Sequence, residues 1–175
     1  MAAEPIDARR IVEALLFVSD EPLPAARLAE IVGDTDARKV RALIDQINAE
    51  YDGAGRPFRI EEIAGGFQML SRPEFKRWLM QLVEGKDARR LSQAALETLA
   101  VVAYKQPVLR ADIESVRGVQ AGEMLRGLLE RGLIRIAGRS ERLGRPLLYG
   151  TTKKFLDIFG LRSLKDLPSL EEISR

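Results

Sequence analysis

The second half of the chain changes from helical to strand-like spacing of its apolar residues. Ser92 is a typical helix N-cap. Behind it, apolar side chains recur three and four residues apart, at Ala95, Leu96, Leu99, Val102 and Ala103. Two further helices and two short strands are predicted to follow, at residues 110–116, 121–131, 133–136 and 146–149. Three helices followed by a β-hairpin predict a winged helix, an elaboration of the helix-turn-helix.

Proline and glycine separate these elements. Gln106-Pro107 should end the first helix, because proline lacks the backbone N–H and restricts the residue before it. Gly118 and Gly132 follow the other two helices, where glycine commonly adopts a left-handed conformation. Gly144-Arg145-Pro146 is predicted to shape the return into the second strand. We interpret Gln106-Pro107 and the glycines as requirements of the fold.

The first half repeats this order of elements. A helix beginning near Asp7 is predicted to bury Ile11, Leu15 and Val18, with Ala14, Leu16 and Phe17 widening its apolar face. A second helix is predicted over residues 25–32, and a third, capped by Thr35 or Asp36, buries Val40, Leu43, Ile44, Ile47 and Tyr51. Strands at residues 58–61 and 67–70 surround the Gly65-Gly66 turn, and an extra helix covers residues 72–83.

The two halves also align in sequence. Glu13-Ala14-Leu15 lies 84 residues before Glu97-Thr98-Leu99, and the breakers and hairpins follow in the same order. Such matching indicates a duplication. The sequence therefore predicts a mainly α protein with small β-hairpins (α+β), built from two tandem winged-helix domains. We place these domains at residues 1–85 and 91–160, and expect residues 161–175 to form a mobile tail unless a partner orders it.

The composition excludes several chemistries. The 175-residue chain has no cysteine and no histidine, so it lacks disulfides, thiolate metal sites and histidine-assisted nucleophiles. It contains no G-x-x-x-x-G-K-[ST] phosphate loop and no G-x-G-x-x-G turn after a strand. Composition alone still allows serine–lysine chemistry, although no serine lies in a recognisable nucleophile turn. We therefore expect no catalytic residue, cofactor or metal, and predict a binding or structural protein rather than an enzyme.

Hydropathy gives no sign of a membrane protein. No apolar run approaches the roughly 20 residues of a membrane span. The N-terminal sequence MAAEPIDARR lacks the apolar core of a signal peptide, so we expect a cytoplasmic protein that does not bind membranes.

Charge is distributed unevenly between the halves. Residues 1–85 carry 11 Lys and Arg against 15 Asp and Glu, whereas residues 86–175 carry 17 against 11. The acidic first half would repel DNA phosphates. The predicted recognition helix of the second half offers Glu123 and Glu130, which are poor readers of base edges. Its wing carries Arg139, Arg142 and Arg145, which are candidates for contacts with phosphates, with an acidic protein segment or with solvent alone.

Long motifs in the second half resemble one protein family. They are LETLAVVAYKQP at residues 96–107, IESVRGV at 113–119, GRPLLYGTT at 144–152 and FLDIFGL at 155–161. These motifs resemble those of the bacterial segregation and condensation protein B (ScpB) family. The first half agrees in length and pattern, with EALLF at 13–17 and EPL at 21–23, so the resemblance covers about residues 7–168.

The resemblance implies partners rather than chemistry. It implies a homodimer formed through the N-terminal domains, which binds the kleisin ScpA and, through ScpA, the SMC ATPase. Such complexes compact and separate replicated chromosomes. The protein would therefore lie in the cytoplasm on the nucleoid, with indirect DNA contact. The short tail departs from the family, so any function of a longer tail does not carry over. The alternative function is a winged-helix DNA-binding transcriptional regulator.

Two sets of residues are candidates for these interfaces. Arginine and tyrosine are enriched in interface hot spots, and six of them lie near the helix ends and the wing: Tyr104, Arg110, Arg117, Arg139, Arg145 and Tyr149. We predict that they bind the kleisin; the alternative is that they form intramolecular caps and hydrogen bonds. An apolar stripe on the extra helix is predicted to form the dimer, through Phe75, Trp78, Leu79 and Leu82.

Overall fold

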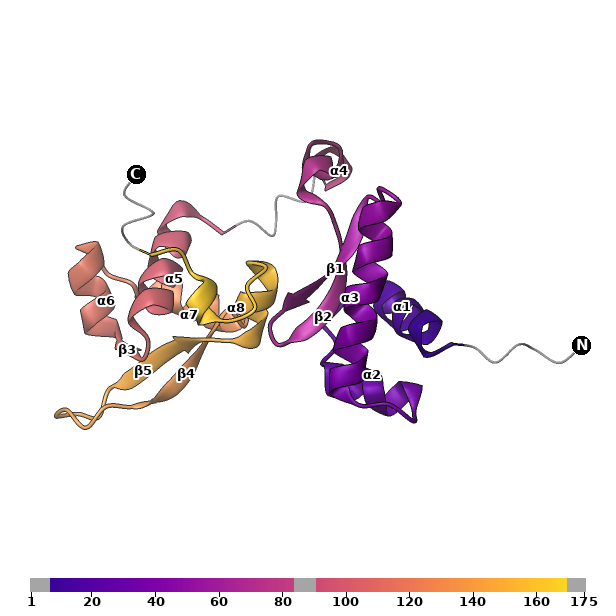
Figure 1. The fold of residues 1–175 in the computed structure, drawn as a ribbon. Coiled ribbons are helices and arrows are strands. Elements are labelled where there is room, and N and C mark those ends of the chain that lie inside the picture. The colour runs from indigo at the N-terminus through magenta and orange to yellow at the C-terminus, as the bar shows by residue number, and fades with distance from the viewer. Residues whose placement is uncertain (1–6, 84–90, 170–175) are drawn as a thin grey trace, which may run out of the picture. The chain divides into compact units, whose positions relative to one another are not determined.

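The computed structural model describes residues 7–83 and 91–169, which fold as two compact units. The first unit comprises residues 1–85 and 161–175, and the second comprises residues 86–160. Each unit combines α-helices with a small antiparallel sheet, so the class is mixed α+β, as the sequence predicted. Figure 1 follows the chain through both units.

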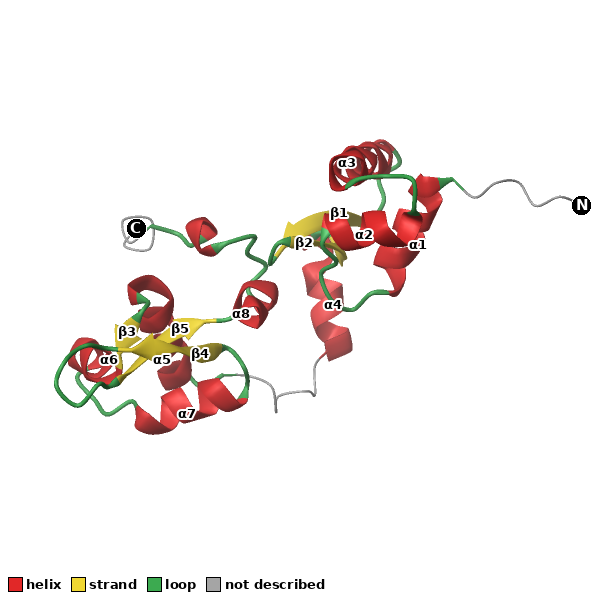
Figure 2. Cartoon of the chain, turned by 90° about the horizontal axis from the view of Figure 1, so that it is seen from below, coloured by secondary structure: helices red, strands yellow, loops and turns green. Residues whose placement is uncertain are grey.

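The first unit begins with three helices, α1 (Ala8–Val18), α2 (Ala25–Val32) and α3 (Ala37–Gly53). The hairpin of β1 (Phe58–Ile63) and β2 (Gly66–Ser71) follows, and then a short 3₁₀ turn and α4 (Lys76–Val83). Asp7 and Asp36 cap α1 and α3, because their carboxylates accept hydrogen bonds from the backbone amides of Arg9 and Lys39. In the two views of Figures 1 and 2, α4 stands apart from α1, α2 and α3.

The core of the first unit confirms the stripe predicted for α3 but corrects the one predicted for α1. Val40, Ile44, Ile47 and Tyr51 of α3 are buried, whereas Leu43, which was also predicted to be buried, is half-buried. On α1 the buried residues are Val12 and Leu16, whereas Phe17 and Val18 are 77% and 81% exposed. The run from Ala14 to Val18 is apolar at every position, so its spacing alone does not fix which side of the helix faces the core.

A buried amide joins α3 to the hairpin. Asn48 lies within the core face of α3; its side-chain amide donates to the Ile60 carbonyl at 2.9 Å and its carbonyl accepts from the Ile60 amide at 2.9 Å. Both backbone groups of Ile60 on this side of β1 are thus satisfied by one side chain, which a buried strand requires.

Replacing Asn48 by alanine should lower the free energy of unfolding by about 1–2 kcal/mol, because the Ile60 N–H and C=O would lose their partners. Urea denaturation followed by circular dichroism measures the change. Gln46→Ala, on the exposed side of the same helix, is the matched control and should shift stability by less than about 0.5 kcal/mol. Equal stabilities of the two variants would contradict this role for Asn48.

The second unit has the same order of elements. Helices α5 (Gln93–Lys105), α6 (Arg110–Arg117) and α7 (Gly122–Glu130) precede β4 (Ile134–Arg139) and β5 (Leu147–Thr151), and α8 (Lys153–Ile158) closes the unit. The predicted N-cap Ser92 is confirmed, because its hydroxyl accepts from the Ala95 amide at 3.2 Å. Figure 1 shows the β4–β5 hairpin extending beyond the helices.

In each unit, a short segment that the sequence did not predict pairs with the second strand of the hairpin. In the second unit, β3 (Val108–Leu109) follows the cis Gln106-Pro107 bond and pairs with β5, giving the strand order β3-β5-β4. In the first unit, Leu23 pairs with Phe67 of β2 through amide-to-carbonyl hydrogen bonds of 2.9 and 2.8 Å. Both segments follow the aligned prolines Pro22 and Pro107. One or two residues are too few to show strand periodicity in a sequence.

Residues 161–169 belong with the first unit rather than forming the separate tail that we expected. The Ala64 amide, at the turn between β1 and β2, donates to the Leu161 carbonyl at 2.9 Å. A short 3₁₀ turn at Leu164–Asp166 follows, capped by Ser163. Residues 84–90, around the predicted boundary between the domains, and the end of the tail at 170–175 lie outside the described residues. Among the described helices, none is long and apolar enough to cross a membrane.

Candidate functional site

The β4–β5 hairpin positions two of the predicted partner-binding residues on one face. Ile136 pairs with Tyr149, and Arg139 pairs with Leu147, with a register shift at Ala137. Residues opposite each other in an antiparallel pair share a face, as do residues two apart on one strand. Arg139 therefore lies on the face of Tyr149. In a regular strand without this bulge, Arg139, three residues after Ile136, would point to the other side of the sheet.

Arg145 extends this face at the loop of the hairpin. The Arg139 guanidinium donates to the Arg145 carbonyl at 3.3 Å, and Arg145 has a left-handed backbone with φ of 43°. Both side chains are exposed, and neither forms an ion pair with any described residue. The hairpin face therefore presents two arginines, the half-buried ring of Tyr149 and the Ile136 side chain, which is 50% exposed.

Arg110 borders the same face from α6. It interacts electrostatically with Tyr149, while its guanidinium donates to Glu114 at 2.8 Å, a bond that raises the pKa of Arg110. The Glu114 carboxylate also accepts from the Ala121 amide at 2.8 Å, and this bond, followed by the Arg110 bond, lowers the pKa of Glu114. A Cβ at Gly122 would lie 3.1 Å from the Arg110 guanidinium, so a larger residue there would shift the arginine by a few tenths of an ångström.

The remaining two predicted residues lie differently. The side chain of Arg117 is only 8% exposed and donates to Glu97 of α5 at 3.1 Å, which lowers the pKa of Glu97. Arg117 thus joins α6 to α5, the intramolecular alternative considered from the sequence. Tyr104, near the end of α5, is 37% exposed. The structure brings Arg139, Arg145, Tyr149 and Arg110 together but does not bring Arg117 to the surface.

Gln106 is a residue whose role sequence reasoning missed. Its side-chain carbonyl accepts from the Thr151 amide at 2.8 Å and from the Thr151 hydroxyl at 3.0 Å, and its side-chain amide donates to Ala103 at 3.0 Å. A Cβ at Gly150 would lie 3.1 Å from the same carbonyl. Gln106 of the first motif and Thr151 of the third therefore contact each other and fix β5 against the end of α5.

The predicted dimerisation stripe is exposed in the single chain. Trp78 is 61% exposed, Leu79 39% and Leu82 81%, while Phe75 is half-buried with its ring 6.4 Å from that of Trp78. Met80 is also 40% exposed. Such a cluster of large apolar side chains on one short helix is typical of a protein–protein interface.

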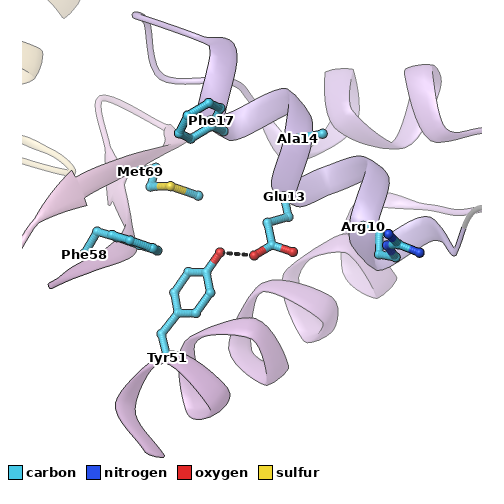
Figure 3. Close-up of a pocket in the computed structure, with 7 residues that line it drawn as sticks. All are labelled: Arg10, Glu13, Ala14, Phe17, Tyr51, Phe58 and Met69. Carbon is cyan, nitrogen blue, oxygen red and sulfur yellow. Dashed lines mark hydrogen bonds between the residues drawn. The ribbon is translucent and has the colours of Figure 1, made fainter. Parts of the chain in front are cut away.

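A pocket beside α1 forms a further apolar surface of the first unit (Figure 3). It has a volume of about 300 Å³ and is lined by Arg10, Glu13, Ala14, Phe17, Tyr51, Phe58 and Met69. The Tyr51 hydroxyl donates to the Glu13 carboxylate, and burial followed by this bond raises the pKa of Tyr51. The exposed Phe17 and the Phe58 and Met69 side chains supply its apolar part. Within residues 7–83 and 91–169, no group of three or more acidic side chains could hold a metal ion.

Known proteins are similar to this chain over most of its length. The protein "Segregation and condensation protein B" of Syntrophotalea carbinolica is 46% identical over 97% of this chain and 85% of its own length. Its counterpart in Symbiobacterium thermophilum is 48% identical over 93% of this chain and 74% of its own length. A solved structure of a dimer of the ScpB N-terminal domain complexed with ScpA peptide is 28% identical, covers 45% of this chain and 90% of that chain, and has a TM-score of 0.40.

The family model gives the same assignment over nearly the whole chain. The model of the segregation and condensation complex subunit ScpB matches residues 10–170, which span both units. This range and the identities above 40% agree with the resemblance found in the sequence. The chain therefore belongs to the ScpB family of segregation and condensation complex subunits.

Proposed function

We propose that each unit is a winged helix and that the chain is a non-enzymatic subunit of an SMC complex. Three helices followed by a hairpin occur in both units, and each hairpin receives a short segment after an aligned proline. The duplication predicted from the sequence supports this interpretation. The complex acts in chromosome condensation and segregation, in the cytoplasm and on the nucleoid.

The kleisin ScpA is the proposed partner of the second unit, and the SMC ATPase is reached through ScpA. The observation that carries this proposal is the bulge at Ala137, because it places Arg139 on the same face of the hairpin as Tyr149. Guanidinium groups can bind carboxylates of a peptide bidentately, while a tyrosine ring buries apolar surface beside them. The proposed surface also includes Arg110, which interacts electrostatically with Tyr149, and Tyr104, which is 37% exposed.

Co-expression of this chain with its kleisin, followed by purification and mass determination, tests the partnership directly. We expect a stable complex containing two copies of this chain. Purification of the chain without the co-expressed kleisin would contradict the proposal.

Homodimerisation is proposed through the stripe of Phe75, Trp78, Leu79 and Leu82. The physical reason is exposure: burying a large apolar side chain contributes about 1.5–3 kcal/mol, and the single chain leaves Trp78 and Leu82 largely in solvent. A symmetric dimer buries the same stripe on both copies, so each exposed side chain counts twice.

The purified protein should hydrolyse neither ATP nor GTP, because its sequence has no phosphate loop and no histidine or cysteine. A phosphate-release assay at millimolar nucleotide measures this. Turnover that persists through repurification and is abolished by a point substitution in this chain would overturn the non-enzymatic assignment.

A further inference from the structure

The positive charge of the second unit is concentrated on its hairpin. The hairpin with its loop, residues 134–151, carries four Arg and one Glu, a net charge of +3. Residues 91–130, which form α5, α6 and α7, carry four against five, a net charge of −1. The basic residues of the hairpin are Arg135, Arg139, Arg142 and Arg145. A basic hairpin on an otherwise balanced unit predicts a polyanionic partner.

The arginines of the hairpin differ from those of the helices in their ion pairs. The helical residues Arg110, Arg117 and Arg126 form ion pairs with Glu114, Glu97 and Glu130. On the hairpin, Arg142 pairs loosely with Asp112 at 3.5 Å, with 67% of the arginine side chain exposed. Arg135, by contrast, is exposed and makes no ion pair with any residue in the described part of the chain. The charge on the hairpin is therefore available to an external anion.

The hairpin has a second side that the proposed kleisin surface does not use. Arg135 pairs with Gly150, which neighbours Tyr149 on β5. Successive residues of a strand point to opposite faces, so Arg135 lies on the face opposite Tyr149 and Arg139. At the loop, Leu143 follows Arg142 and is fully exposed, at 104%. An exposed leucine between arginines at the end of a hairpin is an arrangement suited to the minor groove of DNA.

We propose that Arg135, together with Arg142 and Leu143 of the hairpin loop, contacts the backbone of duplex DNA without sequence preference. The two arginines contact phosphates, and Leu143 lies at the edge of the minor groove. The proposal includes no base reading, because α7 exposes Glu123 and Glu130, and its exposed Arg126 is paired with Glu130 at 3.0 Å. This proposal replaces our expectation that DNA contact is only indirect. It does not depend on kleisin binding, which is proposed for Arg139, Arg145 and Tyr149.

Fluorescence anisotropy of a labelled 30-base-pair duplex, titrated with the full-length protein at several salt concentrations, tests the proposal. We expect binding that weakens steeply with salt, because each phosphate contact releases counterions. Arg135→Glu/Arg142→Glu should lower the affinity at low salt by roughly tenfold or more and flatten the logarithmic salt slope by about 2. Leu143→Ser should weaken binding but leave the slope unchanged, because it removes no charge.

The matched control is Arg38→Glu/Lys39→Glu, an equal change of charge on exposed residues at the start of α3. This variant should retain wild-type affinity. The proposal is overturned if the wild type does not bind the duplex at low salt, or if Arg135→Glu/Arg142→Glu binds like the control. It is also overturned if that variant keeps DNA binding but loses the kleisin segment, which would assign this side to a peptide. A more than tenfold difference between two unrelated duplexes would instead indicate sequence-specific recognition.

Discussion

Replacing Arg139 and Arg145 together by glutamate should weaken binding of the kleisin segment by at least about 2 kcal/mol, roughly thirtyfold in affinity. The bulge at Ala137 places Arg139 on the face of Tyr149, and Arg139 and Arg145 are exposed without an ion pair among the described residues. Reversing both charges replaces two attractions for peptide carboxylates by two repulsions. Isothermal titration calorimetry of the full-length variant with the kleisin segment measures the change.

The variant should remain folded, because substitutions of exposed side chains usually change stability by less than about 0.5 kcal/mol. Circular dichroism checks this point. Lys153→Glu/Lys154→Glu is the matched control: it reverses two exposed charges of the same unit outside the hairpin face and should bind the kleisin segment as the wild type does. Unchanged affinity in a folded Arg139→Glu/Arg145→Glu variant would move the kleisin site away from this face.

Replacing Trp78 and Leu82 by aspartate should convert the dimer to a monomer. These are the two most exposed members of the stripe on α4, at 61% and 81%. Each copy would then bring two carboxylates into an interface that excludes water, at a cost that no remaining contact offsets. The core of the first unit should be unaffected, because its buried cluster lies in α1, α2, α3 and the hairpin rather than in α4.

Sedimentation equilibrium of the full-length protein at micromolar concentration distinguishes the two states. Leu143→Asp is the control, because Leu143 is equally apolar and fully exposed but lies in the second unit. That variant should sediment as the wild-type dimer. A wild type that sediments as a monomer, or a Trp78→Asp/Leu82→Asp variant that remains a dimer, would place the interface elsewhere.

The stripe on α4 and the caps of the helices could be predicted from sequence because each is a local pattern. Trp78, Leu79 and Leu82 recur at helical spacing from Phe75, and Ser92 or Asp36 precede their helices directly. Local spacing also gave the order of helices and hairpins in both units. Local spacing failed on α1, because a continuous apolar run does not indicate which side of the helix faces the core.

The composition of the candidate site depends on contacts between distant residues. Arg117 is buried because Glu97, on another helix, accepts its hydrogen bond, and an isolated Arg-Gly at a helix end does not reveal such a partner. The bulge at Ala137 interrupts what looks like regular alternation, so the face occupied by Arg139 is known only from the register with β5. Gln106 likewise meets Thr151 across 45 positions of sequence. Each case requires tertiary structure that sequence periodicity does not contain.

The contact between Ala64 and Leu161 can form only late in synthesis, after the core of the first unit. All core residues of the first unit precede residue 70, so its interior can form while the ribosome is still translating the second unit. The Leu161 carbonyl, which receives the Ala64 amide, emerges only after the whole second unit. The second unit is thus an insertion within the first. A chain truncated after residue 160 would lack Leu161, so the Ala64 amide in the turn between β1 and β2 would lose its hydrogen-bond acceptor.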